Sequence, residues 1–207
     1  MAIQSNTFSS FLRSRYLFHL HTDFVDGELS IADYFQFARK NNVEVLVFLE
    51  HIRKEPTYDV DRYVAQIREN SKNGVHALVG FEAKILSNGT LDIPDHCINV
   101  ADVIGFAEHG GDFEDVCSLY RCIAQVVNRY SRLVWVHPGL WLKRKKIWNE
   151  NLLTYLSLLQ IISKRSDILI EQNKRYDLVP VRFAKTVPNS HRVIGLDSHR
   201  FSDLSIS

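Results

Sequence analysis

Residues 16–27 read YLFHLHTDFVDG. A short apolar run leads directly into His19 and His21, which are one residue apart, and Asp23 and Asp26 follow within a few residues. The apolar run predicts a buried strand. Imidazole and carboxylate groups, which are common metal ligands, therefore stand where this strand is expected to end.

The same arrangement recurs along the chain. Short apolar runs alternate with segments of helical periodicity, as in IADYFQFARK, for which Ser30 is the expected N-cap. Strands that alternate with helices predict βα units and parallel strands. The seven runs begin at Tyr16, Val43, His76, Asp102, Leu133, Asp167 and Arg192. The region from Leu86 to Asn99 departs from this rhythm, and its Asn88-Gly89 pair predicts a tight turn.

Composition predicts a single domain over residues 1–207, because the chain is short and 45% of its residues are hydrophobic. Lys plus Arg total 25 and Asp plus Glu total 24, so the formal charge of +1 provides no global attraction for nucleic acid or an anionic membrane. Recognition of an anion must therefore be local.

The three cysteines are Cys97, Cys117 and Cys122, an odd number at spacings that indicate neither a disulfide framework nor a zinc knuckle. They are interpreted as reduced thiols of a cytoplasmic protein. No stretch approaches the ~20 apolar residues needed to span a bilayer, so the sequence predicts no membrane segment.

Every predicted strand is followed by a histidine or an acidic residue. In a β/α barrel the C-terminal strand ends meet at one mouth, so these side chains would gather in space. The set suits zinc, iron or manganese and is too rich in nitrogen for calcium. Six of the nine histidines follow predicted strands, and they are His19, His21, His51, His109, His137 and His199. A lone histidine in such a place is more often structural, but six together favour a metal site.

The motifs HLHTDFVDG, LEH, GFE, EHG, VHP and GLDSH occur in this order along the chain. This is the order of the motifs of the PHP (polymerase and histidinol phosphatase) domain family, which the chain resembles from about Tyr16 to Asp203. The resemblance implies an α/β fold, a distorted seven-stranded (β/α) barrel, that holds two to three divalent metal ions, zinc, manganese or iron.

The resemblance also implies three groups of metal ligands. The first consists of His19, His21, Glu82 and Asp197. Glu82 would bridge to a second ion bound with His109 and His137. The third consists of Asp26, His51 and His199.

Two features depart from the family pattern. Leu49-Glu50-His51 stands where the family often has Thr-Asp-His, which places the chain nearer the histidinol-phosphatase branch. The sequence also ends soon after His199, with little room for a closing helix. Either the barrel is left open there and a partner subunit of an oligomer covers it, or the segment before Tyr16 packs across it.

Such metals lower the pKa of a bound water to about 7 and neutralise phosphoryl oxygens, so the implied reaction is hydrolysis of a phosphoester by a metal-activated water. Glu82, Asp197 and His199 are the expected catalytic residues, although Asp197 and His199 are poor free bases if they bind metal. Asp23 and Glu50 are expected to orient a ligand histidine or to be solvated acids.

The candidate substrate-binding residues are Arg53, Glu171, Asn173, Arg175 and Arg200. Guanidinium groups suit phosphate oxygens. For Glu171 and Asn173 the alternative is a hydrogen bond that braces the loop. The run from Lys143 to Lys146 is interpreted as a solvated loop.

The favoured function is hydrolysis of a small phosphomonoester. A single-strand exonuclease or phosphodiesterase is a less favoured alternative, supported by the run Lys143 to Lys146 beside Trp141 and Trp148 and opposed by the neutral net charge. A non-catalytic metal-binding module is the third. The sequence identifies neither the physiological substrate nor the metal used in the cell.

Overall fold

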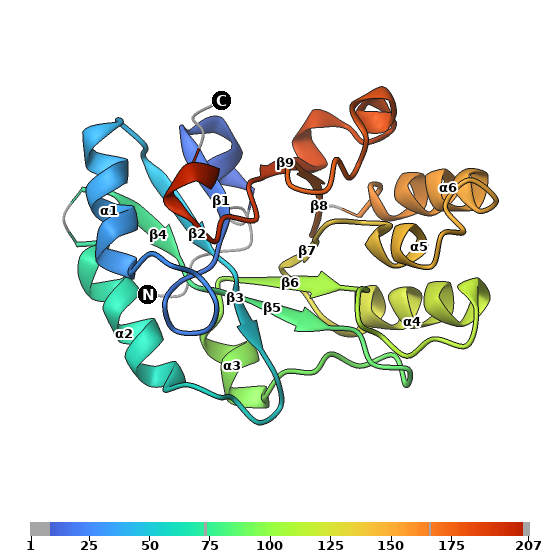
Figure 1. The fold of residues 1–207 in the computed structure, drawn as a ribbon, viewed down its shortest axis with the longest axis horizontal. Coiled ribbons are helices and arrows are strands. Elements are labelled where there is room, and N and C mark those ends of the chain that lie inside the picture. The colour runs from blue at the N-terminus through green and yellow to red at the C-terminus, as the bar shows by residue number, and fades with distance from the viewer. Residues whose placement is uncertain (1–8, 73, 166, 205–207) are drawn as a thin grey trace.

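A computed structural model describes residues 9–72, 74–165 and 167–204 (Figure 1). Within these residues, nine parallel strands form two sheets, ordered β1-β2-β4 and β3-β5-β6-β7-β8-β9. The strands are β1 Tyr16–Leu20, β2 Val45–Phe48, β3 Glu50–Ile52, β4 His76–Leu78, β5 Gly80–Lys84, β6 Val103–Ala107, β7 Leu133–Trp135, β8 Ile168–Asn173 and β9 Arg192–Gly195. The predicted α/β class with parallel strands is confirmed.

The strand count differs from the prediction, because a second short strand forms at two of the seven runs: β3 begins just after the run at Val43, and β4 and β5 divide the run at His76. Leu49 separates β2 from β3, and Val79 separates β4 from β5. At Val79 the backbone N–H donates to the Asp102 carboxylate, 2.8 Å away, and at Leu49 it donates to the carbonyl oxygen of Leu20. The bond at Leu49 continues the parallel pairing of Leu20 with Phe48, whereas at Val79 a side-chain acceptor takes the place of a backbone one.

The edge strands β1 and β9 are joined by backbone hydrogen bonds just past the end of β9. Leu196 N donates to Phe18 O at 3.0 Å, and Ser198 N donates to His19 O at 2.9 Å. A parallel bridge also pairs Leu20 with Ser198. Closure of the two sheets into a barrel stays a prediction.

Helices flank the sheets on both sides of the view in Figure 1, with α1 and α2 on one side and α4, α5 and α6 on the other. The helices are α1 Ile31–Lys40, α2 Val60–Asn70, α3 Asp95–Val100, α4 Val116–Arg129, α5 Leu140–Arg144 and α6 Leu152–Ile162, with 3₁₀ turns η1 Ser10–Arg13, η2 Val181–Thr186, η3 Asn189–His191 and η4 Phe201–Asp203. Ser30 caps α1 in a capping box with Asp33, as its sequence predicts. In the described residues, no helix has the length and apolar character to cross a membrane.

The excursion after β5 contains the predicted turn and an additional helix. Gly89 has a φ of 72°, and Ile85 and Leu91 form an antiparallel bridge around the turn. The short helix α3 follows, which the turn signal alone did not predict.

Two buried clusters fix which side chains face inward. One contains Leu17, Ile104, Phe106 and the apolar faces of the helices. The other lies between the strands and contains Phe18, Val47, Val103, Val134, Leu169 and Val193, together with Phe11 from η1. The ring of Phe11 stacks on Phe18 with 6.1 Å between centroids, so Phe11 packs into this second cluster. Whether the segment before Tyr16 covers the side after the last strand stays a prediction.

Candidate metal centre

The nine expected metal ligands lie together, most of them at or just past the C-terminal ends of strands, around Glu82 in the middle of β5. Its Oε2 lies 3.0 Å from His19 Nε2 and 3.5 Å from His21 Nε2. Its Oε1 lies 3.0 Å from His137 Nε2 and 3.8 Å from His109 Nδ1. His51 Nδ1 is 3.6 Å from Oε2, so one carboxylate is close to five imidazoles.

Among the described residues, four groups of three or more side chains have ligand atoms within 4.8 Å of one another. They are His19, His21 and Glu82; Glu82, His109 and His137; His21, Asp26, His51 and His199; and His19, His137 and Asp197. The first two groups match the predicted ones except for Asp197, which the sequence places in the first. Asp197 belongs to the fourth group with His19 and His137, and its Oδ1 lies 3.5 Å from His21 Nε2.

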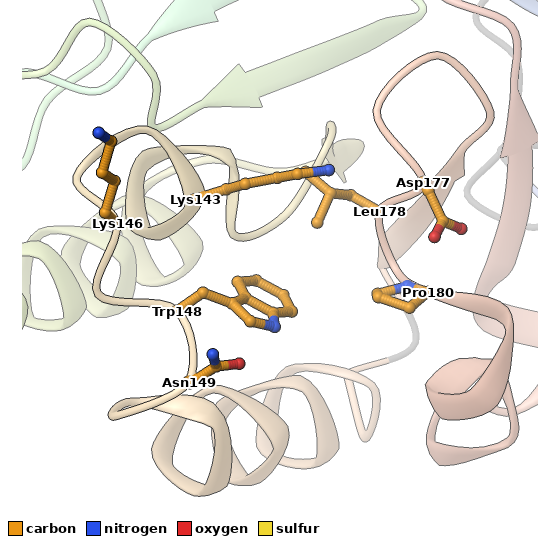
Figure 2. Close-up of a pocket in the computed structure, with 7 residues that line it drawn as sticks. All are labelled: Lys143, Lys146, Trp148, Asn149, Asp177, Leu178 and Pro180. Atoms are coloured by element: carbon orange, nitrogen blue, oxygen red, sulfur yellow. The ribbon is translucent and has the colours of Figure 1, made fainter.

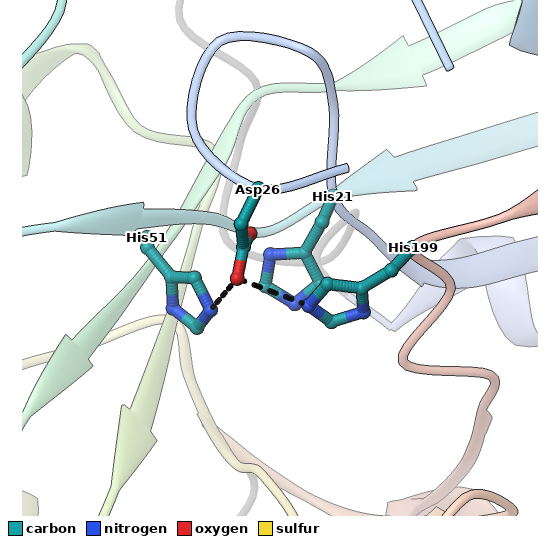
Figure 3. Close-up of side chains that lie close together, drawn as sticks. All are labelled: His21, Asp26, His51 and His199. Atoms are coloured by element: carbon teal, nitrogen blue, oxygen red, sulfur yellow. Dashed lines mark ion pairs between the residues drawn. The ribbon is translucent and has the colours of Figure 1, made fainter. Parts of the chain in front are cut away.

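The third group is larger than predicted because His21 belongs to it. Asp26 Oδ2 lies between two imidazoles, 3.5 Å from His51 Nε2 and 3.4 Å from His199 Nε2 (Figure 3). The ring of His21 lies 4.3 Å, centroid to centroid, from the rings of both His51 and His199. His21 therefore stands between the first and third groups.

Buried imidazole nitrogens without partners show that the donor set fits metal ions. Both ring nitrogens of His21 and Nδ1 of His109 are buried and make no hydrogen bond to a described residue. A buried polar atom in that state is costly unless a partner satisfies it. Imidazole and carboxylate donors together suit a divalent ion such as zinc, manganese or iron.

The charges of the cluster compensate one another. Burial opposes the charged form of His19, but the carboxylates of Glu171 and Asp197 outweigh it and raise the pKa of His19 well above its ordinary value. Burial alone would raise the pKa of Glu82, yet neighbouring His137 holds it well below its usual range. Burial and His137 together lower the pKa of His109 to about 4. Cations bound here would displace the protons held by the raised imidazoles.

Three of the nine residues have a backbone conformation that is rare outside glycine. The φ angles are 69° at His19, 32° at His137 and 54° at Asp197. At His19 the β1-β2 register also shifts, which is the signature of a bulge. Leu17 and Leu20 both belong to the buried cluster that includes the apolar faces of the helices, although strict alternation would place them on opposite faces of the strand. The bulge between them therefore changes the direction of the His19 side chain.

Glu171 and Asn173, predicted as substrate-binding residues, are fully buried and bonded to protein groups. Glu171 Oε1 accepts a hydrogen bond from His19 Nδ1 at 2.6 Å, and Oε2 accepts one from the backbone N–H of His137 at 2.6 Å. Asn173 Nδ2 donates to Glu171 Oε2 at 3.1 Å and to Asp197 Oδ2 at 3.3 Å. These contacts favour the bracing alternative, because the side chains hold three candidate ligands in place.

Glu50 lies beside Nδ1 of His21, whereas Glu82 and Asp197 lie beside its Nε2. Its Oε2 accepts hydrogen bonds from the backbone N–H and the hydroxyl of Thr22, and its Oε1 lies 3.6 Å from His21 Nδ1. The sequence suggests this role for Glu50, whereas Asp23 is exposed.

Tyr34 also supports His21, and the sequence does not predict it. Its hydroxyl donates a hydrogen bond to the carbonyl oxygen of His21 at 2.8 Å, but in the sequence Tyr34 is only one of four apolar positions on a helix face.

The three arginines predicted to bind substrate differ in position. Arg175 lies at the cluster, with Nη1 2.6 Å from His199 Nδ1 and 3.0 Å from the carbonyl oxygen of Asp197. Arg200 is exposed and pairs with Glu28 at 3.2 Å. Arg53 is exposed after β3, and no contact joins it to the cluster within the described part of the chain. Of the three, Arg175 is the one whose guanidinium group lies within hydrogen-bond distance of candidate ligands.

Glu108, beside His109, is a buried carboxyl that faces the helices instead of the cluster. Its Oε1 accepts from Trp141 N at 3.2 Å, and burial raises its pKa from 4.5 to about 7. A raised folded pKa gives a stabilising contribution that is complete below pH 4.5 and is lost as the pH rises through 7.

Glu108→Gln keeps the acceptor for Trp141 and cannot ionise. We expect the variant to match the parent near pH 4.5 and to exceed it at pH 8 by on the order of 3 kcal/mol in the free energy of unfolding. Urea denaturation at both pH values measures this, with exposed Glu114→Gln as the control. An identical difference at pH 4.5 and pH 8 would contradict it.

The fold and the cluster define a class: an α/β protein with parallel strands and a histidine–carboxylate centre whose side chains could hold metal ions. The chain belongs to the PHP domain family, since residues 18–185 match the sequence profile of that domain. The family resemblance inferred from the motifs is thereby confirmed.

Among solved structures, the chain is similar to the histidinol phosphate phosphatase (HISK) from Lactococcus lactis subsp. lactis Il1403, crystallised with zinc, L-histidinol and phosphate. The TM-score is 0.57 with 15% sequence identity, over 90% of this chain and 87% of that chain. At this identity the likeness concerns the fold. A comparison with curated proteins found no match.

Proposed function

We propose that this protein is a metal-dependent phosphoesterase that hydrolyses a small phosphomonoester. The observation that carries the proposal is the placement of Glu82 within 3.8 Å of five imidazoles. Membership of the PHP family and the likeness of the fold to a phosphatase support it. Bound divalent ions would supply an activated water and neutralise charge on the phosphoryl oxygens.

The chain's own residues divide the work. Glu82 would be shared between the first two groups of ligands, together with His19, His21, His109 and His137, while Asp26, His51 and His199 would hold a third ion. Asp197 is held by Asn173 and contacts His21, so we assign it as a ligand instead of a free base. His199 directs Nε2 toward Asp26 and Nδ1 toward the carbonyl oxygen of Asp197, 3.0 Å away, and we assign it likewise.

Arg175 would orient the phosphoryl group. Its guanidinium lies beside His199 and is partly exposed, with 42% of the side chain accessible. A partly exposed guanidinium keeps donors for phosphate oxygens. Glu171 and Asn173 would position ligands and not contact substrate.

Metal-depleted protein reloaded with zinc, manganese or iron tests the proposal directly. We expect turnover of small sugar or amino-alcohol phosphates and little cleavage of 3′-labelled single-stranded DNA. Cleavage of DNA alone would favour the exonuclease alternative. Full metal content without hydrolysis of any ester would favour the non-catalytic module.

His109→Ala tests the second group of ligands. We expect the variant to lose one bound ion per chain by elemental analysis and to lose activity by about 100-fold or more, because metal stabilisation of transition-state charge is worth several kcal/mol. The far-ultraviolet circular dichroism should stay unchanged. The control is His76→Ala, which removes an exposed imidazole at the opposite end of a strand. Full metal occupancy in His109→Ala would refute the second group.

A further inference from the structure

The turn after β8 separates the cluster from a neighbouring pocket. Asn173 and Leu178 exchange two backbone hydrogen bonds and close the turn of residues 174–177. On one side Arg175 contacts His199, and the ring of Tyr176 lies 5.8 Å from that of His137, centroid to centroid. On the other side the carbonyl oxygen of Tyr176 accepts a hydrogen bond from Lys143 Nζ at 2.7 Å. One turn therefore borders both spaces.

The pocket has a volume of about 250 Å³. Trp148 and Pro180 face each other across it, and Lys143 reaches over it toward Leu178 (Figure 2). Lys146 stands at its rim, with its ammonium group directed away from Trp148. It is lined by Lys143, Lys146, Trp148, Asn149, Asp177, Leu178 and Pro180. Its size suits part of a small molecule.

The walls of the pocket combine a fixed aromatic plane with positive charge. The ring of Trp148 packs against Tyr155 at 4.7 Å between centroids and covers Gly139, where a side chain would collide with the indole. A held indole favours a planar group stacked on it. The charged residues that line the pocket are Lys143, Lys146 and Asp177, two cations and one anion. This excess of positive charge favours an anionic ligand.

We propose that this pocket binds the leaving group of the phosphoester and selects a planar leaving group that carries a second negative charge. The inference rests on the proposed function, because the reacting phosphoryl group would lie at the cluster beyond Tyr176. It also assigns a role to two residues of the basic run Lys143 to Lys146, which the sequence alone favours as solvated.

Matched pairs of aryl phosphates isolate the charge. The first pair is 4-carboxyphenyl phosphate and 4-carbamoylphenyl phosphate, which have nearly the same size and differ in charge. The second pair inserts two methylene groups before the carboxylate or amide, so that reach is also varied. In at least one pair we expect the carboxylate to have a KM about fivefold lower than the amide at similar kcat, the scale of a partly exposed charge interaction.

Two variants should move this preference in opposite directions. Lys146→Gln removes a cation without breaking the bond from Lys143 to the turn, and should reduce the preference toward unity. Asp177→Asn removes the opposing carboxylate and should increase it; asparagine tolerates the φ of 53° at this position. The control is Lys145→Gln, which removes the same charge from a residue that lies 5.8 Å from the Trp141 ring and outside the pocket.

Equal KM values for acid and amide in both pairs, or equal effects of Lys146→Gln and Lys145→Gln, would overturn the inference. If no ester is hydrolysed, the proposed function fails, and calorimetry with 4-hydroxybenzoate on the metal-loaded protein decides separately about the pocket. Binding that Lys146→Gln weakens and Lys145→Gln preserves would support an anion subsite. Absence of binding, or binding that both variants preserve, would overturn it.

Discussion

Glu82→Gln is expected to abolish activity, with a fall in kcat of roughly a thousandfold or more, and to empty the first two groups of ligands. The substitution keeps the size of the side chain but replaces one oxygen by an amide nitrogen that cannot bind a metal. It also removes the negative charge that stands among five imidazoles. Elemental analysis and initial rates on the panel of phosphomonoesters measure both effects.

The metal-free form of Glu82→Gln should also be less stable than the parent. Glu82 is 4% exposed, and its ionised form offsets the protons on His19 and His137, whose pKa values are raised. Breaking a buried pair of this kind costs about 3 to 5 kcal/mol. Glu28→Gln, which removes an exposed carboxylate, serves as the control. Full zinc content with wild-type kcat in Glu82→Gln would contradict the central role assigned to this residue.

The gathering of ligands at one end of the strands could be predicted because it depends on strand direction alone. His19 lies one residue before the end of β1, and His137 and Asp197 lie two residues beyond β7 and β9, and parallel strands present those ends together. Glu82 differs, because it lies in the middle of β5. The predicted α1 and its buried face followed in the same way from period and capping. These are local rules that need no knowledge of the packing partners.

The membership of each group could not be predicted so well, because it depends on side-chain direction. The bulge at His19 and the positive φ values at His137 and Asp197 aim side chains in ways that strict alternation does not describe. His21 joins the third group only because its ring lies between His51 and His199. A residue pattern gives position along a strand, and it does not give these angles.

The role of Glu171 could not be predicted either, because it depends on contacts with residues far away in the chain. At a strand end it has the chemistry of a ligand or of a substrate contact, and the sequence favoured the second. Its partners are His19 Nδ1 and His137 N, 152 and 34 residues away in the chain. Contacts of such long range follow from the assembled sheet, so only the structure identifies the carboxylate as a brace.

Gly195→Ala is expected to lower zinc affinity by about 10- to 100-fold, although Gly195 has no side chain and is not itself a candidate ligand. In the β8-β9 register Gly195 pairs with Asn173, two residues from Glu171. A Cβ at Gly195 would collide with the Glu171 carboxylate. Glu171 must then move and release both His19 Nδ1 and His137 N, so the ring of one ligand and the backbone of another lose their support.

The matched variant Gly105→Ala separates this effect from ordinary packing strain. Gly105 lies in β6, where the nearest neighbours of a Cβ would be Val136 Cγ1 at 3.1 Å and the side chain of Leu49. We expect both alanine variants to lower the melting temperature, but only Gly195→Ala to raise the zinc dissociation constant, measured by competition with a chromogenic chelator. In a Glu171→Ala background, Gly195→Ala should add little further loss, because the group with which its methyl collides is already gone. Equal zinc affinity in Gly195→Ala and the parent would show that Glu171 keeps its hold on the two histidines, or that this hold does not matter for the metal.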